Sequence, residues 1–315
     1  MLGDPAVLSA GTVNADFLLR VDAPLERGAS LIASCLLRTS GGRAANVAVM
    51  ARRLLAPARV FGCVGDDQLG EQALAGPRAA GVDLAGLRRV SGQTGLATIL
   101  VDEGATKTMV LAAGVNDAFS DADGHRLAVE VRASGDRAVL VADTELRPAA
   151  LRPAFEAANE RGRRTVLDPT RPDRVTDELL ALSDHLVPNA DEAARLTGIA
   201  ISSPDDARRA ARRLRERGAR SVHVRLPAGG CVSLWPEGEA LVRPPKVHVV
   251  DSTGAGDAFA GALAASILAR RPPVEAVRRA VAAATCAVSR LGAQESYPDG
   301  EVLDAMAARV RVTVR

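Results

Sequence analysis

The sequence predicts an α/β fold built on a mostly parallel central sheet. Short apolar, β-rich segments alternate with Ala-, Leu- and Arg-rich segments of helical period along most of the chain. The 315 residues are 47% hydrophobic and 25% charged, which is typical of a globular protein with a large core. The chain shows no long linker, internal repeat or low-complexity tract. We therefore expect a single domain over residues 1–315.

The individual elements follow from these local patterns. Short runs of apolar and β-branched residues predict strands at residues 6–9, 59–64, 138–142, 165–167, 185–187 and 221–224. Apolar residues recurring every three or four positions predict helices at residues 44–55, 69–80, 151–161, 205–217, 255–269 and 274–288.

Two segments, at about 14–39 and 93–113, interrupt this alternation. They carry the strand-like runs FLLRV, SLIASCLL, GLATILVD and TKTMVLAAG with no helix between them. We expect one antiparallel sheet outside the main layer, acting as a lid; the alternative is a set of extra edge strands on the main sheet. Apolar residues left over on this sheet predict a homodimer that pairs lid to lid, and they are Leu18, Leu31, Ile32, Leu36, Ile99 and Met109.

Charge and cysteine usage restrict the partners. The net charge is +2 and no basic block predicts nucleic-acid binding; lysine occurs only at 107 and 246, which we attribute to genome composition. The N-terminus lacks a signal-peptide pattern, and the longest uncharged apolar run, 258–269, is too short to span a membrane. The cysteines show no metal or redox spacing, and they are Cys35, Cys63, Cys231 and Cys286. These features predict a cytoplasmic protein without nucleic-acid or membrane partners.

The segment DSTGAGDAFAGAL, residues 251–263, places glycines and a carboxylate where a predicted helix begins. The first turn of a helix has free N–H groups and a partial positive charge, and glycine lets a ligand approach them closely. Gly254, Ala255 and Gly256 therefore predict an anion site. Asp257 beside a bound phosphoryl group predicts a general base that takes a proton from an attacking hydroxyl. The alternative is that Asp257 only complements the helix dipole.

Two other glycine-rich motifs fit this segment poorly. The pattern GxxxxGK[ST] is absent, which excludes a P-loop nucleotide hydrolase. GAGDAF begins like the dinucleotide-binding pattern GxGxxG, but Phe259 stands in place of the third glycine and the segment lies near the C-terminus.

Polar residues near the N-terminus predict recognition of hydroxyl groups. Asn46 lies one turn inside a helix that follows Gly41 and Gly42, where asparagine is unfavourable. Asn14 and Asp16 are two residues apart at the end of a strand, so their side chains point the same way. The alternatives are a solvent-facing asparagine and an ordinary turn at a strand end.

The segment PNADEAARLTG places Asn189 and Glu192 three residues apart at a helix start, on one face. Such a pair can orient water around a divalent metal ion. The alternative is a helix N-cap with acidic residues in the first turn.

Taken together, these segments resemble the ribokinase-like (PfkB) family of carbohydrate kinases. The resemblance rests on DSTGAGDAFAGAL, on GGRAANVAVMARRL with FGCVGDDQLG, and on PNADEAARLTG, in the family's order over nearly the whole chain. It implies a three-layer α/β/α sandwich with a β lid, and ATP-dependent phosphorylation of a hydroxyl group. It also implies that Asp257 is the base and that Gly254, Ala255 and Gly256 form the anion hole.

The resemblance implies further site residues and cofactors. Substrate contacts are expected at Asn14, Asp16, Gly42, Arg43, Asn46 and Glu145. Nucleotide contacts are expected at Asn189, Arg225, Gly230, Ala283 and Cys286. Glu192 is expected to support Mg²⁺ through water. A monovalent cation such as K⁺ is expected at Asp251, Thr253, Gly292 and Ser296, because AVSRLGAQES resembles the ribokinase segment beside adenine.

The chain departs from the family pattern at three places. Arg43 follows the glycine pair where ribokinases usually have lysine, and arginine is bulkier and forked. Residues 225–230 read RLPAGG where relatives read TLG and a further glycine, and Pro227 has no N–H to offer a nucleotide. The GRAAN segment at 42–46 lies between the ribokinase pattern and that of other sugar kinases, so the sugar stays open.

The leading interpretation is a kinase for ribose or a related unphosphorylated pentose. The alternative is a nucleoside kinase of the same fold, for adenosine, inosine or pseudouridine, because ADTEL and LTGIAISS resemble pseudouridine-kinase segments. Only 2% of residues are aromatic, and Phe17 is the one candidate in the lid for stacking on a base. A third reading, a non-enzymatic regulator on an inactive kinase scaffold, is disfavoured because Asp257 and both neighbouring glycines are present.

Overall fold

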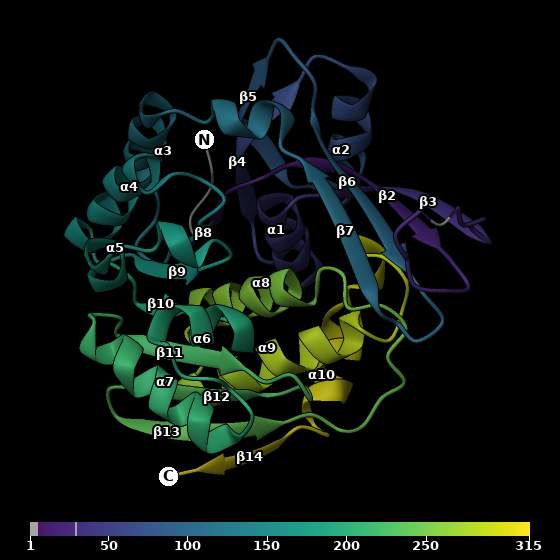
Figure 1. The fold of residues 1–315 in the computed structure, drawn as a ribbon. Helices are drawn as coiled ribbons and strands as arrows, with labels where there is room; N and C mark the ends of the chain where they lie inside the picture. Colours follow the sequence, from purple (N-terminus) through teal and green to yellow (C-terminus); the bar gives the residue numbers. More distant parts are fainter. Residues whose placement is uncertain (1–5, 29) are drawn as a thin grey trace.

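A computed structural model describes residues 6–28 and 30–315. The chain forms a ten-stranded sheet with helices on both faces, and a separate four-stranded sheet stands to one side (Figure 1). Residues 1–5 and 29 belong to the predicted domain and lid but lie outside the described residues.

The main sheet is parallel over most of its width. In spatial order its strands are β14 (Arg311–Val314), β13 (Gly238–Arg243), β12 (Cys231–Trp235), β11 (Ser221–Arg225), β10 (His185–Leu186), β9 (Arg164–Asp168), β8 (Val139–Asp143), β1 (Val7–Ala10), β4 (Ala58–Gly65) and β5 (Asp83–Val90). All pairs from β11 to β5 are parallel, and β12, β13 and β14 extend the sheet antiparallel.

The helices form two layers, each with its own apolar core. One face is covered by α1 (Arg43–Arg53), α2 (Gln68–Ala79), α8 (Ala255–Leu268), α9 (Pro273–Ala287) and α10 (Gly300–Ala307). The other face is covered by α3 (Asp121–Ala133), α4 (Pro148–Glu160), α5 (Asp177–Ala181), α6 (Ala190–Thr197) and α7 (Pro204–Glu216). The three-layer α/β/α sandwich is therefore confirmed, and no described helix has the length and apolarity needed to cross a bilayer.

Each predicted strand and helix overlaps an observed one, because those segments carry clear apolar patterns. The sequence does not predict α3, α5, α10 or the strands β5, β12, β13 and β14. In α3 the first turn is acidic, and its start is marked instead by a capping box between Ser120 and Asp123. The strands β12 and β13 form a hairpin at the antiparallel end of the sheet. No helix separates the two strands, so they do not show the strand–helix alternation that predicts the other strands.

The four-stranded sheet is the predicted lid, so the alternative of extra edge strands is wrong. Its order is β3 (Cys35–Gly41), β2 (Asn14–Arg20), β6 (Gly95–Val101) and β7 (Lys107–Ala112). The expectation that it is wholly antiparallel is also wrong, since β2 and β6 pair in parallel. In the chain, β2 follows β1 and β6 follows β5, and β1 and β5 run in the same direction in the main sheet. The first strands of the two lid hairpins, β2–β3 and β6–β7, therefore leave the main sheet side by side and in the same direction.

The lid buries one face and exposes the other. Leu18 and Ile99 lie in a small core on the inner face with Ala97 and Val101, so they are not left over as predicted. Met109 is on this inner face too, because it pairs directly with Ile99, but it is 40% exposed as expected, since it lines the cavity. Side chains alternate along a strand, so Phe17, Leu19 and Leu36 belong to the outer face instead. Leu31, Ile32 and Leu36 are exposed as expected.

Candidate active site

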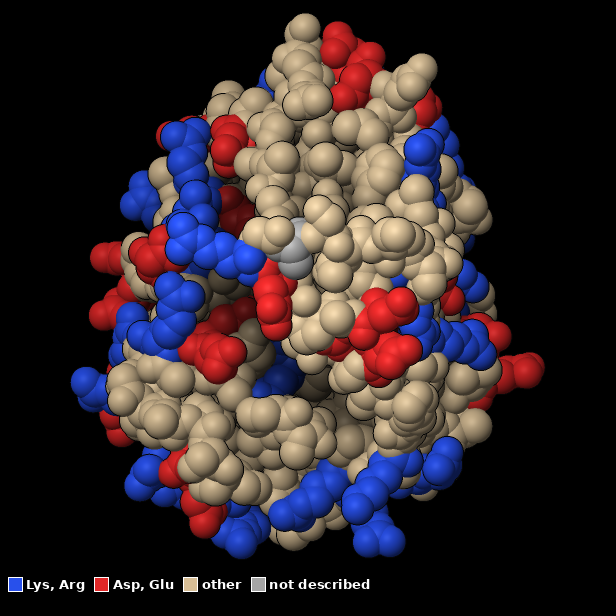
Figure 2. All heavy atoms as spheres, turned by 45° about the vertical axis from the view of Figure 1, so that its right-hand side comes forward, with Lys and Arg blue, Asp and Glu red and all other residues tan. Residues whose placement is uncertain are grey.

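A cavity of about 770 Å³ lies between the inner face of the lid and the carboxyl edge of the main sheet. Figure 2 turns the lid side of the molecule forward and shows a hollow near its centre, bordered by acidic side chains, with a basic side chain visible inside. Residues from the segments DSTGAGDAFAGAL, GGRAANVAVMARRL and PNADEAARLTG line this cavity, whereas none from FGCVGDDQLG does. In open α/β sheets ligands bind outside the carboxyl ends of the strands, so the location fits a substrate site.

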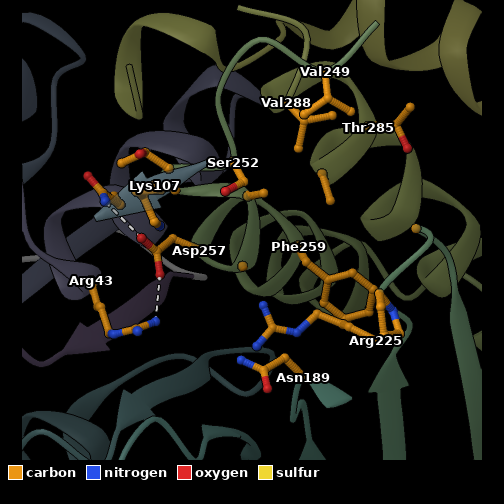
Figure 3. Close-up of a pocket in the computed structure, with 18 of the residues that line it drawn as sticks. Arg43, Lys107, Asn189, Arg225, Val249, Ser252, Asp257, Phe259, Thr285 and Val288 are labelled. Atoms are coloured by element: carbon orange, nitrogen blue, oxygen red, sulfur yellow. Dashed lines mark hydrogen bonds and ion pairs between the residues drawn. The ribbon is translucent and has the colours of Figure 1, made fainter. Parts of the chain in front are cut away.

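Asp257 lies in the first turn of α8, at the floor of the cavity. The helix begins after Gly254, whose φ of 72° is favourable for glycine. Asp257 is only 6% exposed, and its Oδ2 accepts a hydrogen bond of 2.8 Å from Nδ2 of Asn46 (Figure 3). Burial raises the pKa of Asp257, while Arg43 and Asn46 pull it down. A carboxyl group with a raised pKa beside a helix N-terminus suits a general base.

Arg43 joins three carboxylates around this base. Its guanidinium lies 3.1 Å from Glu145, 3.5 Å from Asp168 and 3.4 Å from Asp257. Burial acts to lower the pKa of Arg43, but Asp257, Asp168 and Glu145 raise it above its ordinary value, so the group stays charged. The guanidinium is a planar fork whose donors point in several directions, whereas a lysine ammonium is a compact point charge. A lysine at position 43 could not reach the three carboxylates with the same geometry. The departure from the family at position 43 therefore organises the acidic cluster.

Asp143 and Asp168 lie behind the cavity lining, next to Arg43 and Asp257, and the sequence interpretation missed them. Asp143 ends β8, and Asp168 ends β9 beside Arg43. Burial and the neighbouring Glu145 raise the pKa of Asp143 well above its ordinary value. Each aspartate directly follows or ends a predicted strand, in the segments VLVAD and TVLD. A carboxylate at the carboxyl edge of a parallel sheet was the available signal.

Asp16 and Asn14 present unsatisfied polar groups to the cavity. Asp16 is 5% exposed, and its Oδ1 has no hydrogen-bond partner among the described residues. A Cβ atom on Gly41 would lie 2.0 Å from the other oxygen of Asp16, so glycine at 41 makes room for this carboxylate. Asn14 accepts a hydrogen bond of 2.7 Å from Asn116, which leaves its amide nitrogen free to donate. These groups fit hydroxyls of a bound ligand.

Gly42 and Asn46 place the first turn of α1 next to Asp257. Gly42 has φ of 88°, and a Cβ there would lie 2.5 Å from the carbonyl oxygen of Thr12. Asn46 is 4% exposed, so the alternative of a solvent-facing asparagine is wrong. Its Oδ1 accepts a hydrogen bond of 2.9 Å from Gln294, and its Nδ2 donates to Asp257. Asn46 therefore orients the base as well as lining the cavity.

Three of the five residues predicted to contact a nucleotide lie in the cavity lining, and two do not. Asn189, Arg225 and Gly230 line the cavity. Ala283 and Cys286 do not: both are buried away from it. The side chains of α9 that line the cavity are instead Val281, Ala284, Thr285 and Val288. A shift of one residue turns a helical side chain by about 100°, so a resemblance in sequence does not fix which position faces the ligand.

Arg225 lies directly against the anion hole. A Cβ atom on Gly256 would lie 2.1 Å from Nη1 of Arg225, so the glycine makes room for the guanidinium. The nearest carboxylates, Glu192 and Asp168, lie at 3.4 and 3.5 Å from Nη2. Pro227 lines the same wall of the cavity. Figure 3 shows Asn189 and Arg225 together at one end, with Val249, Thr285 and Val288 clustered at another.

Asn189 and Glu192 form the helix cap that was the alternative interpretation. Oδ1 of Asn189 accepts from the Glu192 N–H at 2.8 Å, and Oε2 of Glu192 accepts from the Asn189 N–H at 2.7 Å. Both residues also line the cavity, so the cap and a ligand role are compatible. Burial, and then Asp168, raise the pKa of Glu192 to about 7. No group of three His, Cys, Asp or Glu side chains in the described residues is arranged to hold a metal ion.

The loop before α8 is tied to the segment after α9. Oδ1 of Asp251 accepts from the N–H and the hydroxyl of Thr253 at 2.8 and 2.7 Å. Oδ2 of Asp251 accepts from the Gly292 N–H at 2.9 Å. Ser296 donates to the carbonyl of Ala293 at 2.6 Å, and the following Tyr297 hydroxyl reaches the Gly254 carbonyl at 3.0 Å. The predicted cation residues thus lie on two segments packed beside the anion hole.

The sequence profile of the pfkB family carbohydrate kinases matches residues 4–300. This chain belongs to that family. It is 31% identical over 289 residues to a ribokinase from Haemophilus influenzae, covering 91% of this chain and 94% of that protein. It is 33% identical over 299 residues to an ATP-dependent ribose-1-phosphate kinase from Halopiger xanaduensis, covering 92% and 94%.

The fold comparison agrees with the family assignment. The structure of Arabidopsis thaliana ribokinase complexed with ribose and ATP superposes with a TM-score of 0.83 at 27% identity, over 96% of this chain and 98% of that one. The chain is therefore a phosphotransferase of the carbohydrate-kinase family, acting on a sugar hydroxyl.

Asp16→Asn is predicted to stabilise the ligand-free protein at pH 8. Burial, with Asp257 and Glu295 nearby, raises the pKa of Asp16 from 3.8 to about 7. The folded state then binds the proton more tightly than the unfolded state, so stability falls as pH rises from about 4 to about 7. The variant lacks this loss and should gain about 2–4 kcal/mol at pH 8 and little at pH 4.5. Urea unfolding at both pH values checks this; an equal effect at both would contradict it.

Proposed function

We propose that this protein transfers the γ-phosphate of ATP to a hydroxyl of ribose or a closely related pentose. The observation that carries the proposal is the set of unsatisfied polar groups on the lid side of the cavity, led by the buried Oδ1 of Asp16. Such groups bind hydroxyls and discriminate against ligands that lack them. The identity to ribokinases over nine-tenths of the chain supports the same substrate class.

The aromatic residues argue against a nucleoside as the acceptor. Phe17 does not line the cavity; it lies on the outer face of the lid, where the Arg38 guanidinium stacks 5.5 Å from its ring centre. Phe259 is the one aromatic residue among the described lining residues, and it lies next to Arg225, away from the lid. A base bound beside Asp16 would therefore have no aromatic ring to stack on.

The geometry accounts for the transfer step. A sugar hydroxyl held between Asp16 and Asp257 gives its proton to the Asp257 carboxylate as its oxygen bonds to the γ-phosphorus. The bond from that phosphorus to the leaving oxygen of ADP breaks in the same transfer. Backbone N–H groups at the start of α8 stabilise the charge on the phosphoryl oxygens. Arg43 and Asn46 hold Asp257 in position throughout.

The nucleotide is placed at the other end of the cavity. Arg225 and Gly230 would contact its phosphates, and Val249, Thr285 and Val288 provide a largely apolar wall for the adenine. Asn189 and Glu192 are the residues that would orient water around Mg²⁺, and the small number of carboxylates fits an ion held mainly by phosphates and water. When bound, Mg²⁺ neutralises charge on the phosphates.

Asp257→Asn is expected to lower kcat by at least about 100-fold, because the variant cannot accept the hydroxyl proton. Steady-state kinetics check this, and calorimetry should show nearly unchanged ATP binding. Asp121→Asn, at an exposed aspartate in the first turn of α3 outside the cavity lining, is the matched control for loss of a carboxylate. A kcat for Asp257→Asn within a few-fold of the parent would remove Asp257 from the role of base.

The acceptor class is decided by a kinetic panel of free pentoses, ribose 1-phosphate, adenosine, inosine and pseudouridine. We expect ribose or another free pentose to have the highest kcat/KM, because Asn14 and Asp16 hydrogen-bond hydroxyls and the lid side offers no stacking face. If a nucleoside exceeds every free sugar tenfold or more, the acceptor is a nucleoside and the assignment fails.

We propose further that a monovalent cation such as K⁺ binds beside the anion hole. Asp251 and Gly292 link the two segments there, and an ion bound between them would fix the loop that leads into α8. The prediction is a higher rate in K⁺ than in tetramethylammonium at equal ionic strength. Equal rates in the two salts would rule out this activation.

Dimerisation through the outer face of the lid is also proposed. Leu36 and Val110 are 50% and 64% exposed on that face, and charged side chains are sparse over a broad area of the side seen in Figure 2. We expect a dimer at micromolar concentration by sedimentation and a monomer for Leu36→Glu; a monomeric parent would refute the dimer.

The free cysteines of the described residues fit the reducing cytoplasm, where we place the protein.

A further inference from the structure

Both lysines of this chain line the candidate active site. Of 40 Lys and Arg residues only Lys107 and Lys246 are lysine, and both belong to the lining of the cavity. Lys107 is the first residue of β7 and pairs with Val101, so its side chain is on the inner face of the lid with Met109 and Leu111. Because lysine is so rare in this chain, the presence of a lysine on the inner face of the lid is not explained by composition.

Lys107 carries a charge that the protein does not neutralise. It is half-buried, and no carboxylate of the described residues lies within 4.0 Å of its ammonium group. Burial lowers the pKa of Lys107, and the more distant Asp251, Asp257 and Asp16 act to raise it. Figure 3 draws Lys107 beside Ser252 and Asp257, so its side chain lies in the part of the cavity next to the start of α8. Partial burial of an unpaired cation costs free energy, and an anionic group of a ligand that pairs with the cation would offset this cost.

A second cation lies across the start of α8. The guanidinium of Arg225 fills the space that glycine leaves at position 256, and its Nε has no hydrogen-bond partner among the described residues. Its two carboxylate neighbours, at 3.4 and 3.5 Å, are at the long end for charged hydrogen bonds. The helix N-terminus between the two cations is positive as well, so the site is prepared for a group with several negative oxygens.

We propose that Lys107 is a catalytic residue supplied by the lid, which contacts the transferring phosphoryl group on the side opposite Arg225. The proposal rests on the proposed kinase function. As the γ-phosphorus leaves the ADP oxygen and bonds to the sugar oxygen, charge spreads over its three other oxygens. Lys107 stays protonated and stabilises that charge, while the hydroxyl proton goes to Asp257.

The position of Lys107 also links acceptor binding to transfer. Met109 and Leu111, on the same strand, line the cavity with Asp16. A sugar that orders this strand against Asp16 therefore orders Lys107 at the phosphoryl group. With the sugar site empty the cation is not held there, which lowers wasteful hydrolysis of ATP.

The alternative partner for the Lys107 ammonium is an anionic group on the acceptor molecule itself. A relative at 33% identity is a ribose-1-phosphate kinase, so a phosphate on the sugar is a concrete competitor for Lys107. The two ideas differ in what the loss of the charge does to a neutral sugar. Contact with the phosphoryl group predicts a loss of kcat for every acceptor; contact with a substrate phosphate predicts a higher KM for the phosphorylated acceptor alone.

The experiment compares Lys107→Met, which keeps most of the apolar stem, with Lys107→Arg, which keeps the charge. Thr108→Met is the control, since Thr108 is the next residue of β7 and is exposed on the outer face. With the best free pentose, Lys107→Met should lose about 10- to 100-fold in kcat with KM for ATP and sugar changed less than about threefold. Lys107→Arg should recover most of the rate, and Thr108→Met should match the parent.

A binding measurement separates this proposal from the kinase assignment. ADP, Mg²⁺ and aluminium fluoride mimic the transferring phosphoryl group, and with pentose they should raise the melting temperature of the parent and of Thr108→Met. Lys107→Met should lose most of that increase and keep the increase given by ADP and Mg²⁺ alone. If the parent phosphorylates no sugar, the kinase assignment fails, and the fluoride comparison still tests the phosphoryl contact.

Two results would overturn the role of Lys107. One is a Lys107→Met enzyme with parental kcat on free pentose and an unchanged response to aluminium fluoride. The other is a defect confined to KM for ribose 1-phosphate, which would assign Lys107 to an anionic acceptor instead.

Discussion

The site depends on the pairing of Asp257 with Arg43. A carboxylate that is 6% exposed is strongly destabilising unless cations and donors surround it, and here one guanidinium, one amide and a helix N-terminus do so. The same guanidinium reaches Glu145 and Asp168, which end or follow neighbouring strands. One arginine at the start of α1 thus ties three parts of the chain to the base.

Three glycines leave room for the charged groups around this pairing. Gly42 must be glycine for α1 to begin where it does, because its φ is positive and a side chain would meet the Thr12 carbonyl. Gly41 makes room for Asp16, and Gly256 makes room for Arg225. Each of these glycines lets a charged group reach the cavity, so the glycine-rich motifs shape the site as much as they bind the phosphate.

The cavity holds charge that the protein leaves uncompensated. Asp16 keeps an oxygen without a partner, and burial raises its pKa to about 7. Lys107 lies on the edge strand β7 of the lid, and no carboxylate of the described residues contacts it. These groups lower the stability of the ligand-free protein, and a bound sugar and phosphate can satisfy them. A lid is a suitable place for such groups, because a substrate orders the lid as it neutralises them.

The sequence by itself determined the α/β alternation and the separate small sheet, and it pointed to the glycine turn with Asp257 and to the acidic and amide residues that line the cavity. Those features are local, since each depends on the period of apolar residues or on the special conformation of a glycine. Only the tertiary structure decided that β2 pairs in parallel with β6, because that depends on where two distant strands leave the main sheet. It also decided that α9 faces the cavity with Thr285 rather than Ala283, and that Asp143 and Asp168 lie behind the cavity next to Arg43. Contacts between residues more than 100 positions apart in the chain, such as Arg43 with Asp257, follow from how sheet and helices pack and not from any pattern within one segment.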